Sequence, residues 1–256
     1  MSRKAFNKQT KQTHGTNLPN FHLSTKNIAL TACFAALYVV FSFWNLFPVI
    51  GTEDKWINAA VVMAPLFGII LGPYLGVLAI TIGGIAGAFF QVTGVFGPLS
   101  FMPHAAAAFC SGMLTIKKRK VCVATYAPFL FLFAFFPVIG PVWLWPPVIW
   151  LDLIGLIVLA SPLQSKAINA MNEASSSVKL IFSIATTCLT ATLFGHIVGN
   201  ILFEAIHLQV NWRATWQGLT FLYPIERGLI TLAATFVGTP LVKTLRMGLE
   251  NEAKAK

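Results

Sequence analysis

Eight polar side chains that are able to bind a small molecule or carry a proton lie inside otherwise apolar stretches: Asn58, His104, Asp152, His196, Asn200, Glu204, Glu226 and Arg227. An ionisable group in hydrocarbon costs about 2.5–3.5 kcal/mol, so it needs a partner, a wet cavity or a function. All eight lie within about two helical turns, on the order of 12 Å, of the stretch end that the charge distribution assigns to the outer side. Their common depth predicts one ligand site that opens away from the cytoplasm.

Three of these side chains, His196, Asn200 and Glu204, are spaced by four residues, and His207 lies a turn further along. This spacing puts them on one face of a helix, which should point toward protein or water. The stripe suits a ligand site or an interhelical hydrogen-bond ladder. A metal site from His196, Glu204 and His207 is a third alternative, but a close His-x-x-x-His pair is missing. We therefore expect no metal and no cofactor.

The other ionisable residues each need a partner. Glu226 and Arg227 are neighbours on a helix and point about 100° apart, so we expect one to bind ligand and the other to pair across helices. Arg227 alternatively extends to the outer interface. Asp152 lies between Leu151 and Leu153 and is too short to reach far toward water, which predicts a histidine, an arginine or a ligand beside it.

Tryptophan shows a similar one-sided distribution. All seven fall at the outer side once the helices are threaded by charge: Trp44, Trp56, Trp143, Trp145, Trp150, Trp212 and Trp216. An interfacial aromatic belt accounts for most of them, but a belt normally occupies both faces. The alternative is that Trp145, Trp150 and Trp216 stack on a flat ligand.

The composition identifies the elements that position these side chains. The chain is 56% hydrophobic and 10% charged and has 22 Phe. Apolar runs of about 20 residues suffice to cross a bilayer. We predict an all-α, polytopic integral membrane bundle of about six to eight helices, with spans near 28–48, 57–71, 74–92, 99–116, 121–139, 146–163, 179–203 and 218–242. The proline-rich region 121–163 is either two spans or a re-entrant hairpin.

Positive charge sets the orientation. Fifteen of the 18 Lys and Arg residues fall in segments on one side of the predicted bundle, which leaves Lys55, Arg213 and Arg227 on the other. The positive-inside rule then places both termini in the cytoplasm. The net charge of +10 is thereby explained without nucleic acid. We expect a basic tail over 1–27 that is no cleaved signal, one transmembrane domain over 28–246, and a second tail over 247–256.

Motifs for chemistry are missing. The sequence has no G-x-x-x-x-G-K-[ST], H-E-x-x-H or G-x-S-x-G, so we predict that the chain is not an enzyme and does not hydrolyse ATP by the P-loop route. The cysteines have no metal-binding or redox spacing and are interpreted as small hydrophobic residues: Cys33, Cys110, Cys122 and Cys188.

Small residues recur at intervals of four. Ala32 and Ala36 form one such pair, and Gly68, Gly72 and Gly76 form a longer run that Pro73 should break at an inner turn. Small residues let membrane helices approach closely, either within one chain or against a partner.

Three segments carry a resemblance to a known family. The segment 64–88, Ala-Pro-Leu-Phe-Gly-Ile-Ile-Leu-Gly-Pro-Tyr-Leu-Gly-Val-Leu-Ala-Ile-Thr-Ile-Gly-Gly-Ile-Ala-Gly-Ala, resembles the second and third helices of the S components of energy-coupling factor (ECF) transporters. The segment 29–37, Ala-Leu-Thr-Ala-Cys-Phe-Ala-Ala-Leu, is similar to their first helix, with its Ala-x-x-x-Ala contact motif. The segment 223–230, Tyr-Pro-Ile-Glu-Arg-Gly-Leu-Ile, is similar to the start of their last helix.

The resemblance implies a multi-pass subunit of the plasma membrane. It would bind a vitamin or related micronutrient from outside and deliver it with a T component and two ATPase subunits. Ala32 and Ala36 would contact the T component, and the loops 51–56, 93–98 and 206–217 would gate the site. Family members usually have six spans, so 121–163 would be additional, and no segment selects one vitamin.

Two other functions are alternatives. A stand-alone secondary transporter would be coupled to protons through Asp152, His104 or His196, and its uptake would depend on a pH gradient. A scaffold that docks partners through the glycine stripes would bind no small molecule.

Overall fold

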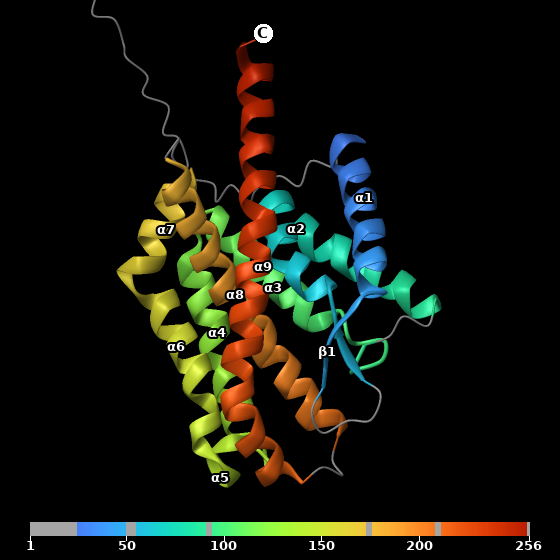
Figure 1. Ribbon diagram of the computed structural model, residues 1–256, viewed down its shortest axis with the longest axis vertical. Coiled ribbons are helices and arrows are strands. Elements are labelled where there is room, and N and C mark those ends of the chain that lie inside the picture. The colour runs from blue at the N-terminus through green and yellow to red at the C-terminus, as the bar shows by residue number, and fades with distance from the viewer. Residues whose placement is uncertain (1–24, 50–54, 91–93, 173–175, 208–210, 255–256) are drawn as a thin grey trace, which may run out of the picture.

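A computed structural model describes residues 25–49, 55–90, 94–172, 176–207 and 211–254 (Figure 1). Almost all of this part of the chain is helical, which confirms the predicted all-α bundle. The elements are α1 (Thr25–Ser42), β1 (Asn45–Pro48), β2 (Trp56–Asn58), α2 (Ala60–Phe89), α3 (Met102–Thr115), α4 (Arg119–Ala134), α5 (Pro141–Leu144), η1 (Pro146–Ile149), α6 (Trp150–Ala160), α7 (Pro162–Asn172), α8 (Ser177–Ile206) and α9 (Trp212–Lys254). Strands β1 and β2 form a short antiparallel hairpin.

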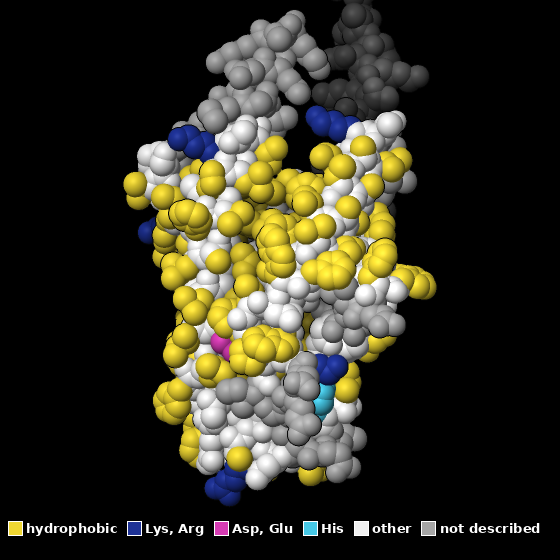
Figure 2. Space-filling view, turned by 45° about the vertical axis from the view of Figure 1, so that its right-hand side comes forward, with side chains coloured by type: hydrophobic (Ala, Val, Ile, Leu, Met, Phe, Trp, Pro, Cys, Tyr) yellow, Lys and Arg dark blue, Asp and Glu magenta, His cyan; other side chains and the backbone are white. Residues whose placement is uncertain are grey.

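Four of the described helices, α1, α2, α8 and α9, are long and apolar enough to cross a membrane. A fifth span results if η1–α6 and α7 count as one, although the chain bends there by 61°. Pro162 explains the bend, because it lacks an N–H and holds Ser161 in an extended conformation. Apolar side chains cover the middle of the molecule, and Lys and Arg gather toward its ends (Figure 2). These features indicate a membrane protein.

Helix α2 contains two of the predicted spans, 57–71 and 74–92, as two arms. The break falls at Gly72, whose φ of 79° lies in the region that glycine tolerates, and Pro73 follows it, as predicted. A Cβ added at Gly76 would lie 3.0 Å from the carbonyl oxygen of Phe67. Nine residues span about 13.5 Å in a straight helix, so this contact shows that the arms fold back on each other.

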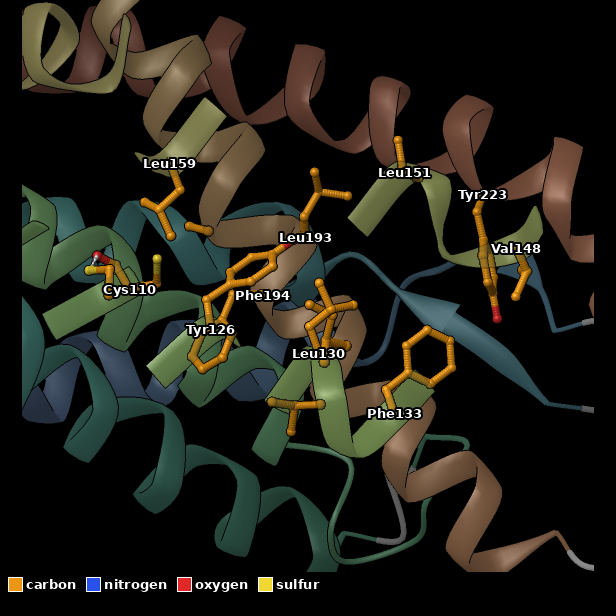
Figure 3. Packing of buried hydrophobic residues seen from close by; sticks show 14 of the residues in the cluster. Cys110, Tyr126, Leu130, Phe133, Val148, Leu151, Leu159, Leu193, Phe194 and Tyr223 are labelled. Atoms are coloured by element: carbon orange, nitrogen blue, oxygen red, sulfur yellow. Dashed lines mark hydrogen bonds between the residues drawn. The ribbon is translucent and has the colours of Figure 1, made fainter. Parts of the chain in front are cut away.

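The proline-rich region 121–163 forms a helical hairpin. Helices α4 and α6 lie side by side and are joined through α5 and η1 (Figure 1). The Tyr126 hydroxyl on α4 donates to the Asp152 carbonyl oxygen on α6 at 2.9 Å. Tyr126 also stacks on Phe194 of α8, with ring centroids 5.7 Å apart (Figure 3). The hairpin is therefore packed into the bundle.

The basic segments lie toward one end of the molecule. The start of α1, helix α7 and the C-terminal end of α9 all lie toward the upper end of the molecule in Figure 1. The α3–α4 turn joins them, because Lys117 to Lys120 border one hollow together with Ser165 and Asn169 of α7. This arrangement is the one that the charge-based threading requires. Residues 1–24 and 255–256 lie outside the described part of the chain.

Most small-residue stripes pack helices within the chain. An added Cβ at Gly68 would strike the Ala108 carbonyl of α3, and one at Gly83 would lie 2.6 Å from the Ala35 carbonyl oxygen of α1. Ala32 and Ala36 differ, because they lie on the exposed face of α1. That face is free to meet lipid or a partner.

Gly83→Ala should destabilise the protein, because the new methyl group would collide with the backbone of α1. We expect a loss of roughly 1–3 kcal/mol, typical of overpacking, measured by thermal unfolding in one detergent. Gly218→Ala is the control, since its Cβ would meet nothing within 4 Å. Equal melting temperatures for the two variants would show that the α1–α2 contact is looser than described.

Candidate functional site

A cavity lies in the half of the molecule where α8 ends and α9 begins (Figure 1). Its walls come from Val49, β2, the start of α2, the segment 94–100, α3, α8 and α9. The cavity volume, counted as the space open to the centre of a water molecule, is about 120 Å³. One water needs on the order of 10–15 Å³ by this measure, so the cavity has room for a compact organic molecule.

Six of the eleven side chains predicted to bind substrate line this cavity: Asn58, His104, His196, Asn200, Glu226 and Arg227. They come from β2 and from three helices, and each is at least nine-tenths buried. The other five do not line it: Trp145, Trp150, Asp152, Glu204 and Trp216. Most of the polar side chains that were predicted to share one depth therefore line the cavity. The three predicted tryptophans lie outside its lining.

A hydrogen-bond chain crosses three helices behind and along the wall. The Tyr223 hydroxyl on α9 donates to Asn200 Oδ1 at 2.9 Å, and the Asn200 amide donates to His196 Nε2 at 3.3 Å. His196 Nδ1 then faces Asp152 Oδ1 on α6 at 3.1 Å. The prediction that Asp152 pairs with a histidine or arginine is confirmed. The chain fixes the imidazole of His196, although Asp152 itself does not reach the cavity.

Glu226 and Arg227 form an ion pair in the wall. Arg227 Nη2 lies 3.2 Å from Glu226 Oε2, and less than a tenth of either side chain is exposed. Both residues line the cavity. The expectation that one would pair across helices was wrong, because the long arginine side chain folds back on its neighbour. The alternative that Arg227 extends to the outer interface does not hold either.

Helix α1 reaches the cavity through a second histidine. His104 Nδ1 lies 2.6 Å from the Tyr38 hydroxyl, and the two rings meet edge to face at 5.7 Å. Both side chains are buried. Tyr38 was not predicted, because a single tyrosine in an apolar helix gives no pattern that shows where its hydroxyl points.

The three tryptophans predicted to stack on a ligand form hydrogen bonds between the α4–α6 hairpin and α9 instead. The indole N–H of Trp145 donates to Thr220 Oγ1 at 3.1 Å, and that of Trp150 donates to the Thr220 carbonyl at 3.2 Å. Trp216 is fully buried and donates to the Ile139 carbonyl at 3.0 Å. These indoles are satisfied by the protein. They stabilise an interface between helices.

Trp56 on β2 does line the cavity, with 43% of its surface exposed. We expect a bound ligand to change the emission of Trp56 most, so Trp56→Phe should remove most of the change in fluorescence that ligand causes. Trp143→Phe is the matched control, because Trp143 is exposed and outside the lining. An undiminished response in Trp56→Phe would place the ligand elsewhere.

Several lining residues gave no signal in the sequence. Phe96, Phe203 and Leu219 form apolar wall, and Thr192 adds a buried hydroxyl. Such residues are common in apolar stretches, so only the packing of β2, α3, α8 and α9 selects them. Tyr223 stood beside Glu226 and Arg227 in the sequence, but its role in the hydrogen-bond chain depends on a contact between helices.

Glu204 is buried outside the lining, and neither of its carboxylate oxygens has a hydrogen-bond partner. In the described residues, no three His, Cys, Asp or Glu side chains gather closely enough to hold a metal ion. The alternative metal site of His196, Glu204 and His207 is therefore not assembled. Parts of the three predicted gating loops, residues 51–54, 93 and 208–210, lie outside the described residues.

The comparisons with protein-family models, with curated proteins and with solved structures gave no match for this chain. The arrangement itself provides a partly open, mostly apolar space with a few fixed polar groups, which is typical of small-molecule sites. Its histidines and carboxylates also suit proton transfer.

Proposed function

We propose that this chain is a multi-pass substrate-capture subunit of the plasma membrane. It binds a vitamin-sized molecule from outside and delivers it as the S component of an ECF-type importer, together with a T component and two ATPases. It carries out no chemistry of its own. The cavity is the observation that carries the proposal, because polar groups that are costly in a bilayer converge there around a space of ligand size.

The exposed face of α1 supports a partner. Thr31, Ala35 and Tyr38 face the bundle, whereas Ala32 and Ala36 point about 100° away from Thr31 and Ala35 and are exposed. A stripe of alanines on a lipid-facing helix is suited to close contact with another membrane helix. The T component is the partner that the resemblance of 29–37 implies.

Uptake into cells tests the proposal. The chain is produced alone and with a T component and two ATPases from the same source, and accumulation of radiolabelled vitamins is measured. We expect accumulation only with the complete set, and loss of it when the ATPases lack their phosphate-binding lysines. Accumulation by the chain alone would contradict the proposal.

A proton-coupled secondary transporter is the second candidate, and the chain from Asp152 through His196 and Asn200 to Tyr223 favours it. Within this chain, the His196 imidazole lines the cavity and can exchange a proton with the buried Asp152 carboxylate, while Asn200 and Tyr223 hold the imidazole in place. Uptake that persists without ATPases and collapses with the pH gradient would support this candidate. A scaffold would show neither uptake nor binding.

A further inference from the structure

Formal charges at the cavity wall cancel one another. Among the lining residues that the structure describes, Glu226 and Arg227 are the acidic and basic side chains, apart from two histidines. They are paired with each other at 3.2 Å, in a buried position. Neither offers an uncompensated charge to a molecule in the cavity.

The histidines are also engaged. His104 is bonded to Tyr38, and His196 is bonded to Asp152, which is completely buried outside the lining. Asp152 therefore acts on the wall only through His196, whose ring nitrogen lies 3.1 Å from the carboxylate oxygen. A charged ligand would lose its hydration and would find no free counter-charge among these groups.

Some polar atoms of the lining residues, by contrast, have no hydrogen-bond partner within the protein. Asn58 Oδ1, Thr192 Oγ1 and Arg227 Nε have no hydrogen-bond partner, and all three residues line the cavity and are more than nine-tenths buried. They come from β2, α8 and α9 and supply an acceptor, a hydroxyl and a donor. Unpartnered buried polar atoms in a native site point to a ligand or water that completes them.

We propose, on the basis of the capture function above, that the cavity selects small organic molecules without net charge, either uncharged or zwitterionic. Such a molecule brings an N–H or O–H donor for Asn58 and a carbonyl or carboxylate acceptor for Arg227. The remaining wall, with Phe96 and Phe203, suits an aromatic or hydrocarbon part. Free inorganic anions, metal cations and organic ions of one sign are disfavoured.

Three matched probes test the class: benzamide, benzoate and benzylammonium share a ring and differ in charge. Their dissociation constants are measured by ligand-observed NMR on the full chain in detergent. We expect benzamide to bind about tenfold more tightly than either ion, a difference of about 1.4 kcal/mol.

Glu226→Gln leaves Arg227 unpaired and should shift the preference to benzoate. Gln217→Lys adds the same charge at an exposed position of α9 and should leave the order unchanged.

Equal or tighter binding of an ion by the unaltered protein, or an unchanged order in Glu226→Gln, would overturn the class assignment. Failure of benzamide to bind at millimolar concentration would also overturn it. None of these three results would remove the capture function, which fails separately if no vitamin binds. A vitamin with a net charge that binds in the cavity would leave capture standing and refute the ligand class.

Discussion

Asp152→Ala will weaken ligand binding by roughly tenfold to hundredfold, although the carboxylate does not touch the cavity. The substitution leaves His196 Nδ1 without its partner at 3.1 Å and frees the imidazole to turn. The hydrogen bonds of His196 with Asn200, and of Asn200 with Tyr223, then lose their fixed direction. Dissociation constants from titration of the purified protein measure the effect.

Asp152→Asn is the matched control, because an amide oxygen of the same shape still accepts a hydrogen bond from His196. We expect it to recover most of the affinity, and thermal unfolding should show that both variants are folded. Breaking a buried pair costs about 3–5 kcal/mol in other proteins, so Asp152→Ala will also melt earlier. Unchanged affinity in a folded Asp152→Ala protein would mean that the chain does not position the site.

Ala32→Trp and Ala36→Trp will abolish assembly with the T component and leave ligand binding unchanged. Both residues lie on the exposed face of α1, where an indole would prevent close approach of a partner helix. The cavity is untouched, because α1 reaches it through Tyr38 on its buried face. Co-purification with a tagged T component measures assembly.

Ala233→Trp serves as the control, since it makes the same substitution at an exposed position of α9. Complexes that form normally with Ala32→Trp and Ala36→Trp would show that this face of α1 meets lipid only. The other exposed small side chain beside them, Cys33, gives an independent readout. We expect a thiol reagent to modify it in the isolated chain and more slowly in the complex.

The sequence predicted where most of the described helices lie, because apolar runs, prolines and charge act locally. It overestimated the number of spans, since four of these helices, or five with the bent pair, rather than six to eight are long and apolar enough to cross a membrane. The break at Gly72, before Pro73, and the hairpin within 121–163 follow from residues that limit the backbone at those points. The cost of polar groups in hydrocarbon also located much of the wall, including Asn58, His196 and Arg227. The free-energy cost of a polar group in hydrocarbon does not depend on which helix packs beside it. Such residues can therefore be recognised without knowing the contacts between helices.

Contacts between helices set the limit of the prediction. Trp145 and Trp216 were predicted at the same depth as the polar groups, but their indoles point toward Thr220 and Ile139. Depth along a helix is readable from sequence, whereas the direction of a side chain around the bundle depends on crossing angles. Because side-chain direction could not be predicted, the role of Tyr38 was missed, and the sequence did not decide whether Asp152 pairs with another residue or binds ligand.

The most direct measurement is a fluorescence titration of the purified, ligand-free protein in detergent with a panel of vitamins and their precursors. Trp56 in the wall is the expected reporter. We predict saturable quenching by one compound at submicromolar concentration, lost in Arg227→Gln and kept in Gln217→Lys. No response to any compound, in fluorescence or in melting temperature, from protein shown to be folded would contradict the proposal that this cavity captures a small molecule.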